Sequence, residues 1–211
     1  MLKKSSRKQD AHPHYSKPLK NGAASIPNSA LLFARNFLRH PKMLGSLIPS
    51  SRFLINHLLN QIDFQRSRCI VEYGPGVGNI TQELLARMHS DCKLIAIEMN
   101  EDFAAFLKHH LHDPRLHVLH DSAAEVSRII RDLKIECADY IISGIPYSTM
   151  PVALRNHILR ESKRVLDPDG AFLIYQFSNA VLPHLEANFS RVHQEFEPLN
   201  VLPARLFYCT K

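Results

Sequence analysis

The chain has 211 residues, 45% of them hydrophobic, which fits one globular domain and excludes a fibrous or low-complexity protein. It contains no apolar run as long as a membrane span and no N-terminal apolar segment typical of a signal peptide. The four cysteines, at positions 69, 92, 137 and 209, lack metal-ligand spacing, so the sequence predicts a reduced, intracellular protein without a bound metal.

Positive charge is concentrated at the N-terminus. Residues 1–52 contain 10 of the 26 Lys and Arg residues but one of the 20 acidic residues, a net charge of +9, and the rest of the chain carries −3. Such a basic segment predicts an anionic partner, either nucleic acid or an anionic lipid surface. Residues 1–27 are rich in Lys, Ser, Asn and Pro, a composition that predicts a disordered tail.

Residues 28–42 predict an amphipathic helix that ends at Pro41. Asn28 is a good N-cap, and Arg35 and Arg39 lie opposite a broad apolar side. Two interpretations stay open, because such a helix either packs on a core or lies in a membrane interface. The basic residues on both sides favour contact with an anionic membrane surface.

A Pro-Ser-Ser-Arg sequence precedes a second predicted helix, which starts at Arg52 and runs to about Asn60. Ser50 and Ser51 both stand at its start, and one of them is expected to be the N-cap. The other hydroxyl is then available for a ligand.

The segment from residue 69 to residue 81 predicts a buried strand over residues 69–73, then a glycine loop and a helix. Gly74, Gly76 and Gly78 allow a close backbone approach to a ligand, and the start of the helix offers free N–H groups. This arrangement suits a nucleotide-like cofactor at the carboxyl end of a strand. The alternative is an ordinary strand-to-helix turn.

The glycine spacing and Glu72 indicate which cofactor binds. Nicotinamide sites use G-x-G-x-x-G to hold a pyrophosphate, whereas this loop reads G-x-G-x-G and follows an acid. The acid repels a pyrophosphate but attracts the ammonium and sulfonium of S-adenosylmethionine (SAM). The segment resembles motif I of the class I SAM-dependent methyltransferases, so Glu72 and the three glycines are predicted to bind SAM.

Two later strand ends carry further candidate cofactor ligands. Glu98 closes the second predicted strand, where its carboxylate can bind both ribose hydroxyls. Asp121 and Ser122 follow the third, a position that resembles the adenine contact of this superfamily. In the alternative interpretation these residues are helix caps: Glu98 for a helix starting near Glu101, and Asp121 or Ser122 for the next one.

The resemblance implies an α/β fold of the Rossmann-like class I methyltransferase type: a seven-stranded, mostly parallel sheet with helices on both faces, plus the N-terminal amphipathic helix. Residues 28–62 are expected to carry the membrane-binding and substrate helices, and residues 63–211 the SAM-binding catalytic domain. Later expected elements are strands over 138–143, 171–177 and 204–210, a turn over 167–170, and a helix beginning at Pro151.

Three segments are similar to the bacterial phospholipid N-methyltransferases: residues 37–52, the motif IV sequence over 143–146, and residues 199–205. The resemblance extends from about residue 30 to the end of the chain. It implies SAM-dependent N-methylation of phosphatidylethanolamine toward phosphatidylcholine, by a cytoplasmic protein attached peripherally to the inner membrane. The expected partners are a phospholipid substrate and an anionic membrane surface, contacted through residues 28–42.

Tyr147 departs from this pattern, because it resembles the last residue of the Asn-Leu-Pro-Tyr motif in the rRNA adenine N6-dimethyltransferases. Ser143 replaces the Asn of that motif, aromatic residues for base stacking are sparse, and the chain ends at Lys211 without those enzymes' helical C-terminal domain. These points favour the lipid. RNA methylation, another amino lipid such as ornithine lipid, and a non-enzymatic binding protein stay open.

The resemblance also implies a mechanism, an in-line attack of the neutral headgroup amine on the sulfonium methyl. The backbone at Ser143, Ile145 and Pro146 and the hydroxyl of Tyr147 are then expected nearest the methyl, where the Tyr147 ring can stabilise the growing cation. Alignment and exclusion of water are the main catalytic contributions.

The headgroup phosphate has its own candidate ligands. Ser51 and Arg52 are the first, with Ser50 as the spare hydroxyl, and a guanidinium is the better match for a phosphate. Arg205 is a second candidate, and its alternative role is an ion pair on the sheet edge.

Overall fold

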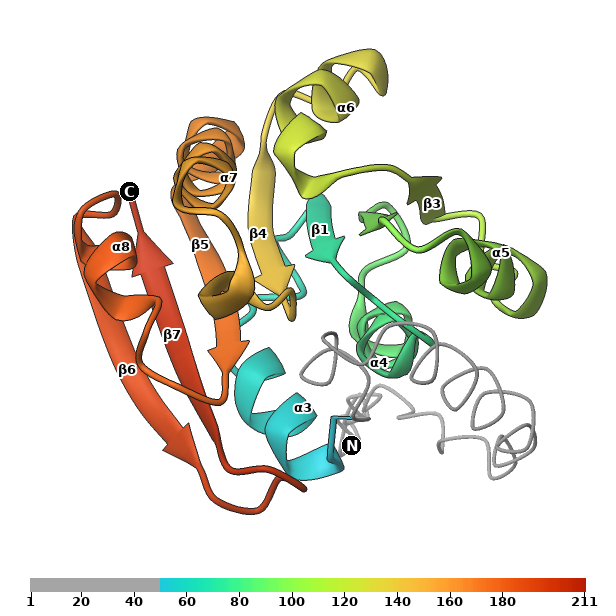
Figure 1. Ribbon diagram of the computed structural model, residues 1–211. Coiled ribbons are helices and arrows are strands. Elements are labelled where there is room, and N and C mark those ends of the chain that lie inside the picture. The colour runs from blue at the N-terminus through green and yellow to red at the C-terminus, as the bar shows by residue number, and fades with distance from the viewer. Residues whose placement is uncertain (1–49) are drawn as a thin grey trace, which may run out of the picture.

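The computed structural model of the chain describes residues 50–211, and Figure 1 shows their arrangement. The tail over 1–27 and the amphipathic helix predicted within 28–42 lie outside the described residues. The strands are β1 Cys69–Tyr73, β2 Lys93–Glu98, β3 Leu116–His120, β4 Ala138–Ser143, β5 Leu166–Gln176, β6 Arg191–Glu197 and β7 Ala204–Thr210. The α-helices are α3 Arg52–Leu59, α4 Asn79–Arg87, α5 Glu101–His110, α6 Val126–Asp132, α7 Val152–Val165 and α8 Leu182–Glu186, and short 3-10 turns η2 and η3 cover Ala123–Glu125 and Tyr147–Thr149.

The seven strands form one sheet in the order β3-β2-β1-β4-β5-β7-β6. The first five are parallel to their neighbours, while β7 runs antiparallel to β5 and β6 antiparallel to β7. Every residue of β1 is buried, because helices cover both faces of the sheet centre. The predicted Rossmann-like methyltransferase sheet is therefore confirmed.

Two apolar clusters hold the helices to the sheet. On one face, α6, α7 and α8 bury residues such as Ile129, Leu159 and Leu185 against the strands. On the other face, α3 and α4 bury residues such as Leu58 and Leu84. None of the helices within residues 50–211 has the length and apolarity that crossing a bilayer requires.

Two predicted details differ in the structure. The expected turn over 167–170 is a bulge inside β5, where the pairing passes from Ala138 with Leu166 to Tyr140 with Ala171. The Asp169 N–H donates to a carboxylate oxygen of Asp167 over 2.9 Å, which stabilises the extra residues locally. Pro151 is the N-cap of α7 and not its first helical residue.

Helix α3 is fastened to the β6–β7 hairpin at the far end of the chain. The Ser51 hydroxyl caps the helix by accepting the Leu54 N–H over 3.2 Å, and the Ser51 N–H donates to the Asn200 side-chain oxygen over 2.8 Å. One turn later, His57 lies between Glu195 and Glu197, with 3.0 Å from its Nδ1 to a Glu197 oxygen. Polar contacts thus supplement the apolar packing of α3.

The His57 contact predicts a pH-dependent stability. Burial lowers the pKa of His57, but hydrogen bonds and charges of Glu197 and Glu195 outweigh burial and raise it above 6.5. A raised pKa means that the ion pairs stabilise the fold fully below pH 6.5 and that this contribution is lost as pH rises through the folded-state value. His57→Gln should therefore lower Tm clearly near about pH 5.5 and only slightly near about pH 8.5.

Thermal unfolding at both pH values checks this, with His112→Gln at an exposed position as the matched control. An equal loss of Tm for His57→Gln at the two pH values would contradict the ion-pair account.

Candidate active site

A cavity of about 270 Å³ lies at the carboxyl ends of the first four strands. Gly74 follows β1, Glu98 ends β2, Asp121 follows β3 and Ile145 follows β4, and all four residues line it. Most of the remaining lining is apolar. The position is the one at which open parallel sheets bind ligands.

Two glycines of the loop have no room for a side chain. Gly74 has φ +68°, and a Cβ there would lie 2.8 Å from the Ile145 side chain. Gly78 has φ +85°, and its Cβ would meet the Leu107 side chain of α5 at 2.7 Å. Both positions combine positive φ with close contact, so the loop requires glycine for two independent reasons. The loop backbone is thereby held against the motif IV segment.

The Glu98 carboxylate joins two loops of the cavity. One oxygen accepts the Gly76 N–H over 3.0 Å and the other accepts the Asn100 N–H over 2.8 Å. Burial raises the pKa of Glu98, while these backbone bonds and the charge of His120 act in the opposite direction. Asn100, not Glu98, caps α5 by accepting the Phe103 N–H, so the alternative capping role of Glu98 is wrong.

Asp121 and Ser122 both line the cavity, and both also have structural partners. The Ser122 hydroxyl accepts the Ala124 N–H over 3.2 Å and so caps the short helix η2. Asp121 accepts the Ser122 N–H over 2.7 Å and pairs with Arg128. The capping interpretation is confirmed for Ser122, and contact with an adenine stays a prediction for both.

Glu72 lies behind the glycine loop and does not line the cavity. It is fully enclosed, and its carboxylate accepts the Thr81 hydroxyl of α4 over 2.7 Å. Burial raises the pKa of Glu72 to about 8; the Thr81 bond opposes this change and the charge of Glu98 adds to it. The structure thus places this acid beneath the loop, while its predicted contact with the cofactor stays a prediction.

The motif IV residues divide into two groups. Ile145 and Pro146 line the cavity, whereas Ser143 and Tyr147 are fully buried and bond to each other, with 3.0 Å between their hydroxyl oxygens. The Gln176 amide donates to the Ile145 carbonyl over 2.9 Å. The hydroxyls of Ser143 and Tyr147 therefore support the loop from inside, and their predicted catalytic contacts stay predictions.

Arg155 of α7 adds a cation below the same loop. It is buried, and its Nη1 donates to the Tyr147 carbonyl over 3.3 Å. Its Nε has no hydrogen-bond partner within residues 50–211. The side chain therefore connects α7 to the segment that follows Pro146.

None of the predicted headgroup ligands lines the cavity. The Ser51 hydroxyl caps α3 and so already has a partner, and Ser50 lies beside Tyr175, where its hydroxyl counteracts the rise that burial causes in the Tyr175 pKa. The guanidinium of Arg52 lies 5.2 Å from the centre of the Phe53 ring. That of Arg205 lies 5.6 Å from the centre of the Phe196 ring, so it stacks on an aromatic ring and forms no ion pair within the described part of the chain.

Sequence reasoning missed much of the cavity wall. Met99 directly follows Glu98 at the end of the second strand, and this position alone could have indicated that Met99 lines the cavity. The other missed residues come from α5, η3 and the first turns of α7, and only the packing of those helices brings them here: Phe103, Thr149, Met150, Leu154 and Ile158.

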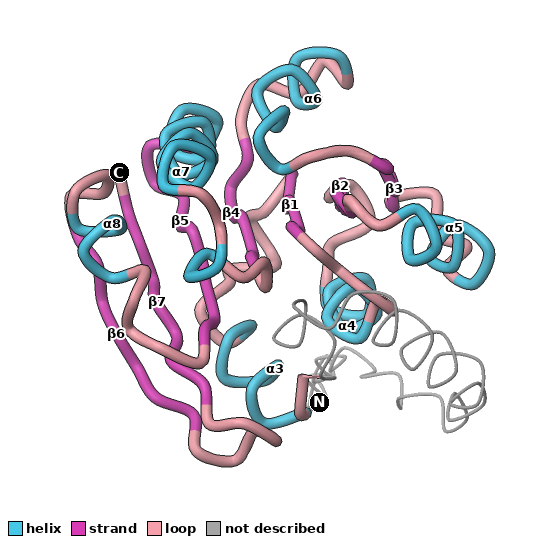
Figure 2. The backbone as a smooth tube through the Cα atoms, viewed as in Figure 1, coloured by secondary structure: helices cyan, strands magenta, loops and turns pink. Residues whose placement is uncertain are grey.

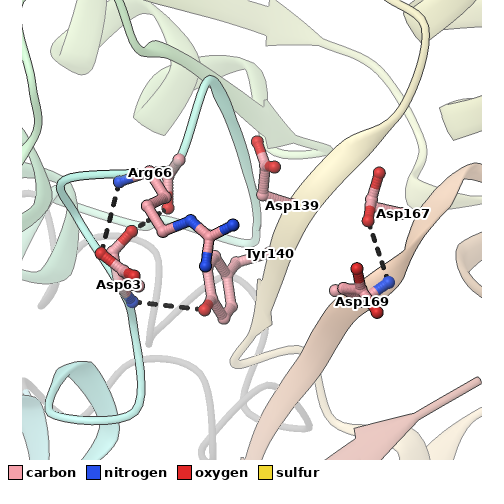
Figure 3. Close-up of a pocket in the computed structure, with 8 residues that line it drawn as sticks. Asp63, Arg66, Asp139, Tyr140, Asp167 and Asp169 are labelled. Carbon is pink, nitrogen blue, oxygen red and sulfur yellow. Dashed lines mark hydrogen bonds between the residues drawn. The ribbon is translucent and has the colours of Figure 1, made fainter.

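A second cavity of about 280 Å³ lies at the opposite edge of the sheet, by the amino ends of β4 and β5 (Figure 3). Its carboxylates fasten backbone segments: Asp139 accepts the N–H groups of Arg68 and Cys69, each over 2.8 Å, and Asp63 accepts the Arg66 N–H. Among residues 50–211 no cluster of His, Cys, Asp and Glu side chains is suited to hold a metal ion. The acidic side chains at this edge therefore have a structural role.

The fold, the glycine loop and the Glu98 carboxylate bonded to that loop define the class: this is a SAM-dependent methyltransferase of class I. Residues 38–176 match the family described as ribosomal RNA adenine dimethylase, more than half of the chain, and the chain belongs to this family.

Three individual proteins illustrate the similarity. An ornithine lipid N-methyltransferase of Singulisphaera acidiphila is 32% identical over 84% of this chain and 94% of its own length. A ribosomal RNA small subunit methyltransferase A of Alkaliphilus metalliredigens is 28% identical over 56% of this chain and 41% of its own length. The structure of human methyltransferase-like protein 13 in complex with SAH, 16% identical, superposes with a TM-score of 0.55 over 82% of this chain and 81% of that one.

The raised pKa of Glu72 predicts a stabilising substitution. An acid whose pKa rises from 4.5 to about 8 destabilises the fold only in its charged form, so the cost is absent below pH 4.5 and grows as pH rises toward 8. Glu72→Gln keeps an acceptor for Thr81 and should raise the free energy of unfolding by at least about 1 kcal/mol near pH 9, but hardly near pH 4.5.

Denaturant unfolding at several pH values measures this, with the exposed Glu186→Gln as the control. Calorimetric SAM binding by the same variant tests the separate prediction that Glu72 binds the cofactor. A variant less stable than wild type at high pH would show that Glu72 is charged and favourably paired.

A supporting role for Tyr147 predicts a mild effect of removing its hydroxyl. Tyr147→Phe loses one buried bond to Ser143 and should lose about 1 kcal/mol of stability, with methyl transfer kept within about threefold. Tyr73→Phe is the matched control, because it loses a bond of the same length, 3.0 Å, to Ser162. A loss of about hundredfold in kcat for Tyr147→Phe alone would place the hydroxyl at the reacting atoms.

Proposed function

We propose that this protein methylates the amine of a membrane amino lipid, with ornithine lipid and phosphatidylethanolamine as the candidate acceptors. The observation that carries the proposal is the similarity to an ornithine lipid N-methyltransferase over 84% of this chain and 94% of that protein. The similarity to the RNA enzyme is confined to 56% of the chain.

The cavity fits SAM, which supplies an electrophilic methyl group when bound. Its wall is largely apolar, which suits an adenine ring, and Glu98 presents a carboxylate at the end of β2. Each Glu98 oxygen accepts a backbone N–H, and a carboxylate has about four acceptor sites, so it can still accept a ribose hydroxyl. Gly74 and Gly76 bring the backbone of the glycine loop to the cavity wall, where it can approach the ligand closely.

At the methyl-transfer end, the chain offers positioning and exclusion of water. Ile145 and Pro146 form an apolar wall, and the Gln176 bond to the Ile145 carbonyl fixes its shape. Burial raises the pKa of Tyr147 far above its usual value, so its phenol remains protonated and cannot be the base at neutral pH. The acceptor amine therefore releases its proton to solvent or to another group.

Both candidate lipids carry an anion close to the amine, a carboxylate in ornithine lipid and a phosphate in phosphatidylethanolamine. We assign Arg52 to this anion, because a guanidinium suits both groups and Arg52 forms no ion pair within residues 50–211. The basic segment over residues 1–52 fits attachment to the cytoplasmic face of the inner membrane, with residues 28–42 as the proposed interfacial helix.

RNA methylation is the second candidate, and the match of residues 38–176 to the ribosomal RNA adenine dimethylase family favours it. Tyr147 supports it as well. Ser143 weakens it, because its hydroxyl is bonded to Tyr147 inside the fold and does not line the cavity.

The test is methyl transfer from radiolabelled SAM with the purified full chain. Separate reactions contain vesicles with ornithine lipid, vesicles with phosphatidylethanolamine, or total rRNA. We expect label in lipid, and we expect Glu98→Ala to lower it by at least about tenfold because two hydrogen bonds of the cofactor site are lost. Label in rRNA alone would contradict the proposal.

A further inference from the structure

Five of the eight large exposed apolar side chains within residues 50–211 lie around the β6–β7 hairpin. They form the hairpin-tip patch, made of Phe53, Phe196, Leu199, Val201 and Leu202. Val201 is 70% exposed and Leu199 is 61% exposed. Such a concentration on the surface marks a site of interaction more often than scattered single side chains do.

The patch is one surface because α3 is fastened to the hairpin. The Ser51 N–H bonds to Asn200 at the tip, which places the first turn of α3 beside it. Phe53 lies one turn before His57, on the side of α3 that faces β6. Figures 1 and 2 show α3 next to the loop that joins β6 to β7.

The patch lies at the same edge of the sheet as the cavity. At this edge Gln176 pairs with Arg205 across β5 and β7, and Arg205 pairs with Phe196 across β7 and β6. The same Gln176 donates to the Ile145 carbonyl in the cavity wall. A surface bound at the patch therefore lies at the edge of the sheet that holds the cavity, with β5 and β7 between β6 and the end of β4.

The charges around the patch are arranged for an anionic partner. Arg52 and Arg205 lie over the rings of Phe53 and Phe196, and neither forms an ion pair within residues 50–211. The neighbouring acids are engaged internally, because Glu195 and Glu197 hold His57. Aromatic and aliphatic tips combined with free guanidinium groups match the boundary between lipid headgroups and acyl chains.

We propose that the hairpin-tip patch inserts into the surface of an anionic lipid bilayer, with Arg205 on a headgroup phosphate and Arg52 on the acceptor-lipid anion already assigned to it. The inference rests on the proposed function, and it adds the orientation in which the cavity edge faces the membrane. It concerns a surface separate from residues 28–42. RNA is a poorer occupant, because aliphatic side chains dominate the patch.

The absence of tryptophan from the chain makes a clean test possible. Val201→Trp places a single fluorophore at the tip of the hairpin in the full chain. Arg131→Trp places it at a well-exposed position in the last turn of α6, and Figure 1 shows α6 at the opposite edge of the sheet. With phosphatidylglycerol–phosphatidylethanolamine vesicles, we expect a blue shift and quenching by brominated acyl chains for Val201→Trp only. Equal behaviour of the two variants, or no shift for either, would overturn the proposal.

A charge test accompanies the fluorescence. Val201→Asp with Leu202→Asp changes the net charge by about −2, as Arg131→Glu does, but only the first should weaken vesicle binding, by about tenfold or more. If both variants weaken vesicle binding equally, the loss is explained by net charge alone and the proposal is overturned. A Val201→Trp emission that is already blue-shifted without vesicles would also overturn the proposal. If that shift depends on protein concentration, a second copy of the chain covers the patch. If it does not, another part of the same chain covers it.

Methylation assays separate this inference from the proposed function. Lipid methylation without a Val201→Trp shift would retain the function and remove the docking surface. A blue shift confined to Val201→Trp, without lipid methylation, would retain the docking surface and remove the proposed function.

Discussion

The structure of the site depends on one buried carboxylate. Glu98 receives an N–H group from the glycine loop and another from the turn that starts α5, so one side chain fixes the separation of two loops that meet at the cavity. Burying an acid is costly unless its oxygens are hydrogen-bonded, and these two bonds offset much of that cost. A residue at the end of β2 thereby joins the start of α5, two residues later in the chain, to the β1 loop, which lies 22 residues earlier.

The sequence predicts those parts of the fold that depend on the local pattern of apolar and polar residues. β1, β4 and β7 have the predicted bounds, because each is an apolar run on a sheet buried from both sides. The bulge over 167–170 could not be predicted, because its residues favour a turn and only the pairing with β4 keeps them within a strand. Tertiary context decided that segment.

The candidate site was predictable to the same extent. Strand ends gave Glu98 and Asp121 as cavity residues, since parallel strands bring their carboxyl ends to one edge. Nothing in the sequence showed that Glu72 and Tyr147 point inward, because that depends on how α4 and the motif IV loop pack. Strong motif residues can therefore support a loop from within, while weakly marked residues such as Met150 and Leu154 form the wall.

This division bears on how one scaffold can serve two substrate classes. The buried pair of Ser143 and Tyr147 fixes the motif IV loop without lining the cavity, so Tyr147, the residue that resembles the RNA enzymes, does not by itself specify RNA. Specificity then falls to what surrounds the mouth of the cavity. Under the proposed function, the hairpin-tip patch with Arg52 and Arg205 presents the acceptor lipid to that mouth, and the Gln176 bond and the β5–β7–β6 ladder connect the patch to the loop. A lipid headgroup presented from a membrane plane meets such a mouth in a fixed orientation, which a freely diffusing amine does not.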